Sequence, residues 1–273
     1  MKRVATIILN RNLKEPTEQL YDFILTNEEP HTDIYILEVG SDPDKLAKDY
    51  TWHANEKLLV EQGLRYPRGM NYALLKLKEE CKYDCYEYFF LLTNDTELCQ
   101  KKTLAPMIDI MDQHNKLGIL SPCSHHWGEK KLLSEKDLLY FWHVQNNALL
   151  LRREFINSVC NTKPNYINFL FDGANFRGFQ SETELIAKGY ANDWATAITT
   201  KVYTEENESY LLEKSDLIKT ESYSMNLQLY LDEGREWLRN KYGFNSRWDM
   251  QLYSKGFYDR FFEYNEHLWE FKL

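Results

Sequence analysis

Tyr88-Phe89-Phe90-Leu91-Leu92-Thr93-Asn94-Asp95-Thr96-Glu97-Leu98 is the stretch of this chain that most strongly predicts its fold. Apolar and aromatic residues, in a run short enough for one buried strand, end abruptly in a polar cluster that contains Asp95. In open α/β sheets, ligands bind beyond the carboxyl ends of strands. The pattern therefore predicts that Asp95 faces a substrate or a metal ion.

Strand-like and helix-like segments alternate on both sides of this stretch. Such alternation is typical of an α/β domain in which helices flank a mostly parallel sheet. Strands are expected at residues 4–9, 33–39, 118–121, 138–143, 145–151 and 197–203, and helices at 16–25, 69–80, 104–114, 152–159 and 181–188. We expect the last of these helices to end at Gly189, because glycine favours the left-handed cap conformation.

The composition changes beyond residue 205. Charged and aromatic residues recur there with helical spacing, at 211–214, 223–238 and 248–262. Their aromatic side chains would be exposed unless they packed on the rest of the chain. The sequence therefore predicts an α/β domain at 1–205 and a helical extension at 206–273 packed on it.

Charge and composition exclude several classes of protein. The net charge of −9 and pI near 5.4 argue against nucleic-acid binding, which needs a basic surface. No apolar run approaches the roughly 20 residues of a transmembrane segment. The five cysteines lack the spacing of a zinc site, so we expect free thiols, as is usual in the cytoplasm.

Six segments, in order along the chain, resemble the inverting family 2 glycosyltransferases. The resemblance implies a GT-A fold with a Rossmann-like sheet, and transfer of a sugar from a nucleotide-sugar to an acceptor hydroxyl, as in polysaccharide biosynthesis. The segments are residues 4–12, 33–42 with Glu38-Val39-Gly40-Ser41, Arg68-Gly69-Met70-Asn71-Tyr72-Ala73-Leu74, 91–98 with Thr93-Asn94-Asp95, 118–122 and 147–155.

The resemblance also implies a binding site for the nucleotide-sugar and a metal ion. Asp95 is the one acid of the family's metal motif that this sequence retains, and Mn²⁺ or Mg²⁺ there would neutralise the leaving diphosphate. The histidine that some members carry after the catalytic helix is absent, and Glu205 is the candidate substitute. The residues implied in nucleotide-sugar binding are Asn12, Glu38 (in place of the family's Asp), Ser41, Arg68, Asn71, Asn94 and Asp95.

The family's catalytic segment, Glu-Asp-x-Asp-Leu, resembles Ser181-Glu182-Thr183-Glu184-Leu185. The resemblance assigns the general base to Glu182, since an acceptor hydroxyl is a weak nucleophile until a base takes its proton. Asp172 is the second candidate if this register has slipped. An ordinary structural reading also exists, because carboxylates favour the start of a helix. Trp142 and His143 are the candidate acceptor-binding residues, because aromatic faces and imidazoles suit sugars.

Two other functions fit parts of the sequence. A non-catalytic relative that binds a nucleotide-sugar or a glycan would tolerate the loss of acidic residues from the metal-binding and catalytic motifs. A sugar-phosphate nucleotidylyltransferase has a similar sheet but begins with a glycine-rich phosphate loop, and residues 9–13 contain no glycine. The expected partners are a nucleotide-sugar and a hydroxyl acceptor in the cytoplasm, with no nucleic acid and no transmembrane segment. Whether the chain forms a homo-oligomer is left open.

Overall fold

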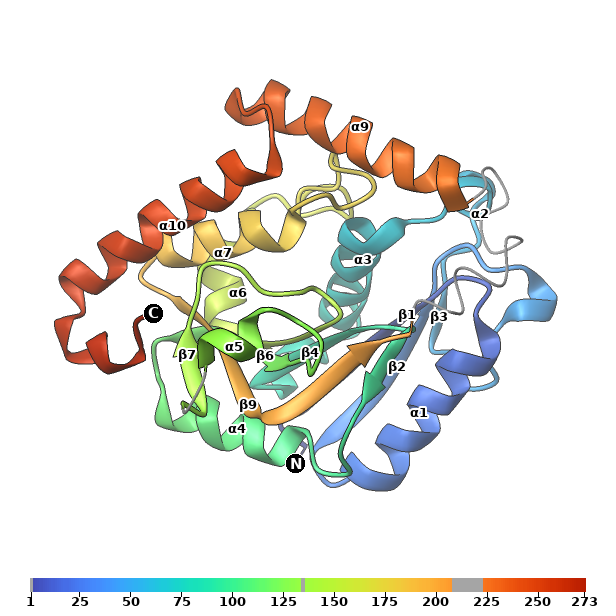
Figure 1. Cartoon of the computed structure of the whole chain (residues 1–273). Helices are drawn as coiled ribbons and strands as arrows, with labels where there is room; N and C mark the ends of the chain where they lie inside the picture. Colours follow the sequence, from blue (N-terminus) through green and yellow to red (C-terminus); the bar gives the residue numbers. More distant parts are fainter. Residues whose placement is uncertain (1, 134–135, 208–222) are drawn as a thin grey trace.

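A curved nine-stranded sheet with helices on both faces organises the chain (Figure 1). The computed structural model describes residues 2–133, 136–207 and 223–273. The strand order is β3-β2-β1-β4-β8-β6-β9-β5, and β7 also pairs with β9. The strands are β1 Val4–Asn10, β2 Thr32–Glu38, β3 Trp52–His53, β4 Tyr88–Thr93, β5 Thr96–Leu98, β6 Leu117–Cys123, β7 Leu138–Tyr140, β8 Ala148–Arg152 and β9 Ala195–Glu206.

The sheet is mostly parallel, as the alternating segments predicted. Strands β3, β2, β1 and β4 are parallel to one another, and β6 is parallel to β9. Strand β8 lies between β4 and β6 and runs antiparallel to both, so the two parallel groups point the same way. The short strands β5 and β7 are antiparallel to β9. The carboxyl ends of β1, β2, β4 and β9 therefore share one edge.

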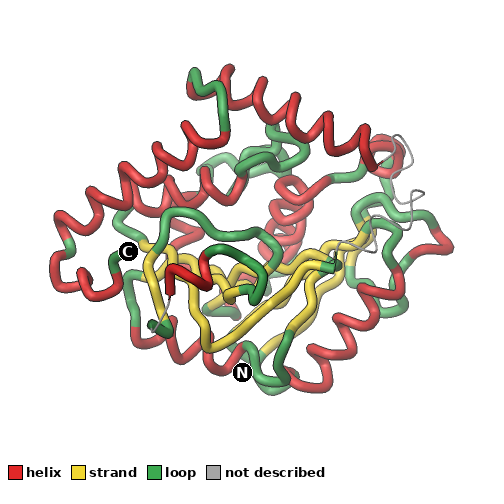
Figure 2. Tube along the Cα trace, in the orientation of Figure 1, coloured by secondary structure: helices red, strands yellow, loops and turns green. Residues whose placement is uncertain are grey.

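Helices cover both faces of the sheet (Figures 1 and 2). Helices α1 (Lys14–Glu28) and α4 (Leu104–Gln113) lie on one face, and α3 (Arg65–Glu79), α6 (Arg153–Val159) and α7 (Ser181–Ala191) lie on the other. The remaining helical elements are α2 Lys57–Gln62, α5 Glu129–Leu133, α9 Tyr223–Tyr242, α10 Arg247–Tyr264 and the 3₁₀ turns η1 Pro43–Lys45, η2 Tyr83–Cys85 and η4 Glu266–Phe271.

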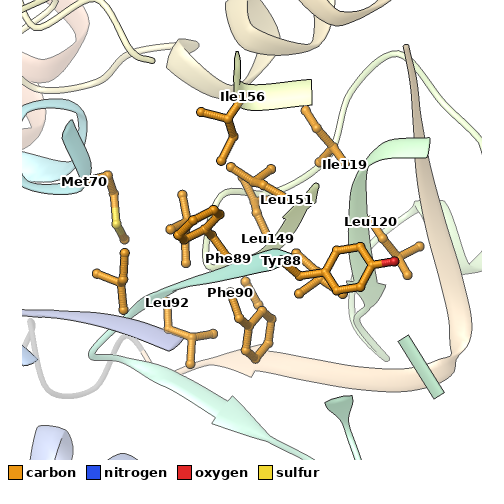
Figure 3. Close-up of a cluster of buried hydrophobic side chains, with 14 of the residues drawn as sticks. Met70, Tyr88, Phe89, Phe90, Leu92, Ile119, Leu120, Leu149, Leu151 and Ile156 are labelled. Atoms are coloured by element: carbon orange, nitrogen blue, oxygen red, sulfur yellow. The ribbon is translucent and has the colours of Figure 1, made fainter. Parts of the chain in front are cut away.

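Strand β4 is buried on both faces, which explains its continuous apolar sequence. Successive side chains of a strand point to opposite faces. Phe89 accordingly lies on the side of Met70 (α3) and Ile156 (α6), while Phe90 and Leu92 lie on the other side (Figure 3). All five are at most 1% exposed. This packing fixes the position of the turn that follows β4.

Several local expectations differ from the structure. The strand expected at 138–143 ends at Tyr140, and the strand expected at 145–151 begins at Ala148. Gly189 lies inside α7, which ends only at Ala191; a Cβ at Gly189 would lie 3.2 Å from the Phe155 ring, so the glycine permits close packing. Helix α3 begins at Arg65, because Pro67 is tolerated in a first helical turn. The short strand β5 was not expected. The segment 211–214 lies outside the described residues.

The C-terminal helices pack on the sheet and on α7. Tyr258, Phe261 and Phe262 of α10 are buried in the main core. A second cluster joins α9 and α10 to α7 and the residues before it: Phe179, Ala187, Trp237, Leu238 and Met250. None of the helices in the described part of the chain is long and apolar enough to cross a membrane.

Candidate functional site

Polar side chains at the carboxyl ends of β1, β2 and β4 are hydrogen-bonded to one another. The Asn10 side-chain amide donates to both carboxylate oxygens of Glu38, each at 3.0 Å. The Asn94 amide donates to Asn10 Oδ1 at 2.9 Å. These bonds connect the loops that follow the three strands, so the turn that carries Asp95 is held against them.

Glu38 lies at the centre of this network. Its side chain is fully buried, and it also accepts hydrogen bonds from Ser41 Oγ at 2.5 Å and from the Ala47 backbone N–H at 2.7 Å. Burial raises the pKa of Glu38, while these bonds oppose that rise. Because both oxygens are used within the protein, this geometry favours a role in holding the loop over the direct nucleotide contact that we predicted.

Asn12 and Ser41 connect the same two loops. The Asn12 backbone N–H donates to Ser41 Oγ at 3.2 Å, and Asn12 Oδ1 accepts from the Asp42 N–H at 2.8 Å. Asn12 has a φ of 60°, in the left-handed region that asparagine tolerates better than most residues. Both predicted residues therefore lie at the edge of the sheet where the resemblance places the nucleotide.

Asp95 lies with Asn94 in the tight turn between β4 and β5. The two residues line a cavity of about 270 Å³ together with Pro16, Gln19 and other residues of α1. The Asp95 carbonyl accepts from the Asn207 N–H at 2.9 Å, and Thr96 pairs with Glu206 across β5 and β9. The structure thus brings the end of β9 to the predicted metal-binding turn.

Glu182 is a buried carboxyl group in the first turn of α7, with only 7% of the residue exposed. The Thr183 hydroxyl donates to Glu182 Oε1 at 3.3 Å. Burial raises the pKa of Glu182 to about 7, and the negative charge of Glu206 contributes to the rise. A carboxyl group with a pKa near neutrality can accept a proton efficiently under physiological conditions.

His143 is connected to this carboxyl group through Thr183. Its Nδ1 is 3.1 Å from Thr183 Oγ1. Burial lowers the pKa of His143 to about 4, with a contribution from Arg247, so the imidazole is neutral at physiological pH. Trp142 instead packs on α10, with its ring 5.1 Å from that of Tyr258. The structure favours a packing role for Trp142 over acceptor binding.

Two neighbouring acids at the end of β9, Glu205 and Glu206, have different surroundings. Glu205 accepts from Ser124 Oγ at 2.6 Å and from the His125 N–H at 2.8 Å, so it holds the segment after β6. The next residue of β9, Glu206, points to the opposite face, and its charge acts on Glu182. Glu206 therefore lies on the Glu182 side of β9, and sequence reasoning did not single it out.

Asp172 is held in an ion pair. It accepts from Lys241 Nζ at 2.5 Å and from Trp237 Nε1 at 3.1 Å. Burial raises the pKa of Asp172, but these bonds outweigh burial and keep it below its usual value. Lys241 also donates to Glu184 at 2.6 Å. Asp172 and Glu184 thus attach α9 to the domain, and Asp172 is less suited than Glu182 to accept a proton.

Arg68 and Asn71 hold the loop that leads to α7. Arg68 Nε donates to the Gly173 carbonyl at 2.7 Å, and its guanidinium lies 4.7 Å from the Phe176 ring centre. Asn71 is fully buried and makes four hydrogen bonds to the backbone of residues 166–171. For Asn71, this geometry favours a structural role over the predicted nucleotide contact.

Comparison with known proteins adds to this geometry. No family model and no curated protein matches the sequence. A solved mannosyltransferase, PcManGT from Pyrobaculum calidifontis in complex with GDP-Man and Mn²⁺, aligns with a TM-score of 0.55 at 11% identity, over 93% of this chain and 73% of that one. The chain has the GT-A fold. Glucosyl-3-phosphoglycerate synthase from Mycobacterium tuberculosis, with phosphoglyceric acid bound, aligns at 0.51 and 12% identity, over 85% and 80% of the two chains.

At identities of 11% and 12%, these likenesses show the fold alone. The arrangement of side chains must therefore support any function for this GT-A chain. The described residues contain no cluster of three or more His, Cys, Asp or Glu side chains suited to a metal ion. Asp95 and Glu206 nevertheless provide carboxylates at the paired ends of β5 and β9. Mg²⁺ is often bound by one or two carboxylates together with substrate phosphates, so these residues fit a partial site.

Proposed function

We propose that this chain is a glycosyltransferase that transfers a sugar from a nucleotide-sugar to an acceptor hydroxyl with inversion. The observation that carries the proposal is Glu182, a buried carboxyl group with a pKa of about 7. The charge of Glu206 at the end of β9 acts on it, so Glu182 lies at the edge of the sheet where ligands bind. The GT-A fold is shared with enzymes whose structures contain GDP-Man or UDP.

Glu182 acts as the general base in this proposal. The acceptor hydroxyl attacks the anomeric carbon on the side opposite the diphosphate, and Glu182 receives the hydroxyl proton. A new C–O bond forms as the bond to the diphosphate breaks, so a single displacement inverts the anomeric centre. A positioned base of this kind contributes about 10²–10⁴-fold to the rate.

Thr183 and His143 orient this base. Thr183 Oγ1 is 3.3 Å from Glu182, 3.1 Å from His143 and 3.2 Å from Gln180 Oε1. Because His143 is neutral, it adds no positive charge that would keep Glu182 ionised and weakly basic. The hydrogen bonds fix the direction of the carboxyl group, and the burial sets its basicity.

We further propose that Asp95 and Glu206 hold Mn²⁺ or Mg²⁺ together with the diphosphate of the nucleotide-sugar. The ion would neutralise the charge that develops on the leaving diphosphate. Asn10, Asn12, Glu38, Ser41 and Asn94 form the connected loops beside it. Their role in the proposal is to shape the nucleotide site, and the free, exposed thiols of Cys81, Cys85 and Cys99 suit the cytoplasmic location that we propose.

Donor cleavage by the purified protein tests this function. UDP-, dTDP- and GDP-linked sugars are supplied with Mn²⁺, and release of the nucleoside diphosphate is measured for wild type, Glu182→Gln and Asp172→Asn. We expect turnover in wild type and a loss of roughly 10²–10⁴-fold in Glu182→Gln. A larger loss in Asp172→Asn, with Glu182→Gln active and both variants folded, would assign the base to Asp172.

A non-catalytic relative that binds a nucleotide-sugar or a glycan is the second candidate. One observation favours it: the described residues lack a cluster of three protein ligands for a metal ion. This candidate predicts that nucleotide-sugars bind without being cleaved, with or without Mn²⁺. Calorimetric binding in the absence of any nucleoside diphosphate release would establish it.

A further inference from the structure

Tyr66 carries a buried hydroxyl group that the mechanism above does not use. Tyr66 lies in the first turn of α3, and its ring packs edge-on against Phe171 at 5.4 Å. Within the described ranges, no protein group forms a hydrogen bond with its hydroxyl. A buried polar group without a hydrogen-bond partner destabilises the fold, so proteins seldom retain one without a use.

The helix turn that carries Tyr66 meets the helix turn that carries the proposed base. A Cβ at Gly178 would be 3.1 Å from Pro67 Cδ and 3.5 Å from Ser181 Oγ, so the first turn of α3 meets the start of α7 there. Burial raises the pKa of Tyr66, and the charge of Glu182 adds to the rise. Tyr66 and Glu182 therefore lie on two helix ends that meet at Gly178.

Tyr230 approaches the same carboxyl group from α9. Its ring packs edge-on against Phe179 at 5.1 Å, three residues before Glu182 in the chain. Burial raises the pKa of Tyr230, and the charges of Glu182 and Glu206 add to the rise while Arg247 opposes it. Two tyrosines from different helices thus lie near the start of α7, which carries Glu182.

We infer that Tyr66 and Tyr230 bind the acceptor, and that the acceptor is an uncharged sugar whose hydroxyl they direct toward Glu182. The inference rests on the proposed function, because Glu182 supplies the base. Phenol rings pack against the C–H faces of sugars, and their hydroxyls donate to or accept from sugar hydroxyls. The Tyr66 hydroxyl then gains the partner that the protein does not provide.

The charges around the site favour an uncharged acceptor over an anionic one. The carboxyl groups of Glu182 and Glu206 both act on Tyr230, and one guanidinium, that of Arg247, opposes them. His143 contributes no charge at physiological pH, because burial lowers its pKa to about 4. A phosphorylated or carboxylated acceptor would meet like charges here, and like charges repel.

Acceptor kinetics of conservative variants test the inference. Tyr66→Phe and Tyr230→Phe each remove one hydroxyl and keep the ring, and Tyr72→Phe on α3 and Tyr253→Phe on α10 are matched controls. The assay uses UDP-glucose and GDP-mannose as sugar donors, with methyl glycosides as uncharged acceptors and 3-phosphoglycerate as an anionic one. We expect the acceptor KM of Tyr66→Phe to rise roughly 5–50-fold, the worth of one hydrogen bond, with the donor KM unchanged.

The outcomes separate this inference from the proposed function. An unchanged acceptor KM in Tyr66→Phe and Tyr230→Phe, or wild-type preference for 3-phosphoglycerate, overturns the inference while the transferase stands. If wild type cleaves no sugar donor, the binding of methyl glycosides, measured by calorimetry, tests the sugar site instead. Binding that Tyr66→Phe weakens and Tyr72→Phe does not supports the sugar site and refutes the transferase. No binding of any methyl glycoside refutes the sugar site as well.

Discussion

Replacing Glu182 with glutamine should stabilise the fold as it removes activity. The carboxyl group has a pKa of about 7 in the folded chain against an ordinary value of 4.5, chiefly because of burial. The folded state therefore holds the proton more tightly than the unfolded state. Below pH 4.5 the group is neutral in both states and costs nothing; stability falls as the pH rises toward 7, and the full cost is present above 7.

The size of the effect follows from the same two values. Each tenfold change in proton binding is worth about 1.4 kcal/mol, so an ionised Glu182 costs the fold roughly 3 kcal/mol. Between pH 5 and pH 8, roughly 2–3 kcal/mol of this cost develops. Glutamine cannot ionise. The free energy of unfolding of Glu182→Gln, relative to that of wild type, should therefore rise by roughly 2–3 kcal/mol between pH 5 and pH 8.

Urea unfolding followed by circular dichroism at pH 5 and pH 8 measures the gain. Glu184→Gln is the control, because Glu184 is equally buried but accepts from Lys241 at 2.6 Å and Tyr242 at 2.5 Å. Removing that charge leaves Lys241 without one partner, so Glu184→Gln should lower stability, by up to about 3 kcal/mol. If the difference between Glu182→Gln and wild type is the same at both pH values, Glu182 does not have a raised pKa and our reasoning about its burial is wrong.

Other expected outcomes concern activity, metal binding and packing. The kcat/KM of wild type should rise with pH and level off above about 7, as Glu182 loses its proton; a profile flat from pH 5 to 9 would exclude it as the base. Asp95→Ala should keep the fold and lose the Mn²⁺-dependent part of nucleotide-sugar binding by calorimetry, and unchanged affinity would remove Asp95 from the metal site. Asn71→Ala should lower the free energy of unfolding by about 2–4 kcal/mol, since four buried hydrogen bonds are lost; a loss under about 1 kcal/mol would show that the loop holds without them. Truncation after residue 206 should give insoluble protein, because it removes Tyr258, Phe261 and Phe262 from the core, and a soluble product that melts cooperatively would contradict this packing.

The fold was predictable from local patterns. The apolar run at β4 and the alternation around it predicted the mostly parallel sheet and the layers of helices. Such patterns work because a strand buried on both faces must be apolar throughout. They failed at Gly189, where close contact with Phe155 replaces the expected helix end. A helix-terminating residue and a residue that allows close packing look the same in a sequence.

The candidate site was predictable only in part. Asp95 was singled out because a polar cluster followed a strand, and Glu182 because its segment resembles the family's catalytic segment. The resemblance placed Glu182 first and Asp172 second, through one register of the catalytic segment. The structure adds that burial raises the pKa of Glu182, whereas the bonds of Asp172 to Lys241 and Trp237 lower its pKa, and this favours the same order. Neither property can be read from neighbouring residues.

The sequence by itself determined the main helices and strands, their alternation, and the position of Asp95 just after the carboxyl end of a buried strand. These features follow from short-range periodicity and burial. The tertiary structure alone decided which side chains meet. The start of α7 with Glu182 meets the first turn of α3 with Tyr66, and Tyr230 of α9 packs on Phe179 just before it, although up to 164 residues separate these positions in the chain. The strand order places β9 beyond β8 and β6 and returns its end to β5. Non-local strand pairing of this kind depends on the packing of the whole sheet, which no local pattern records.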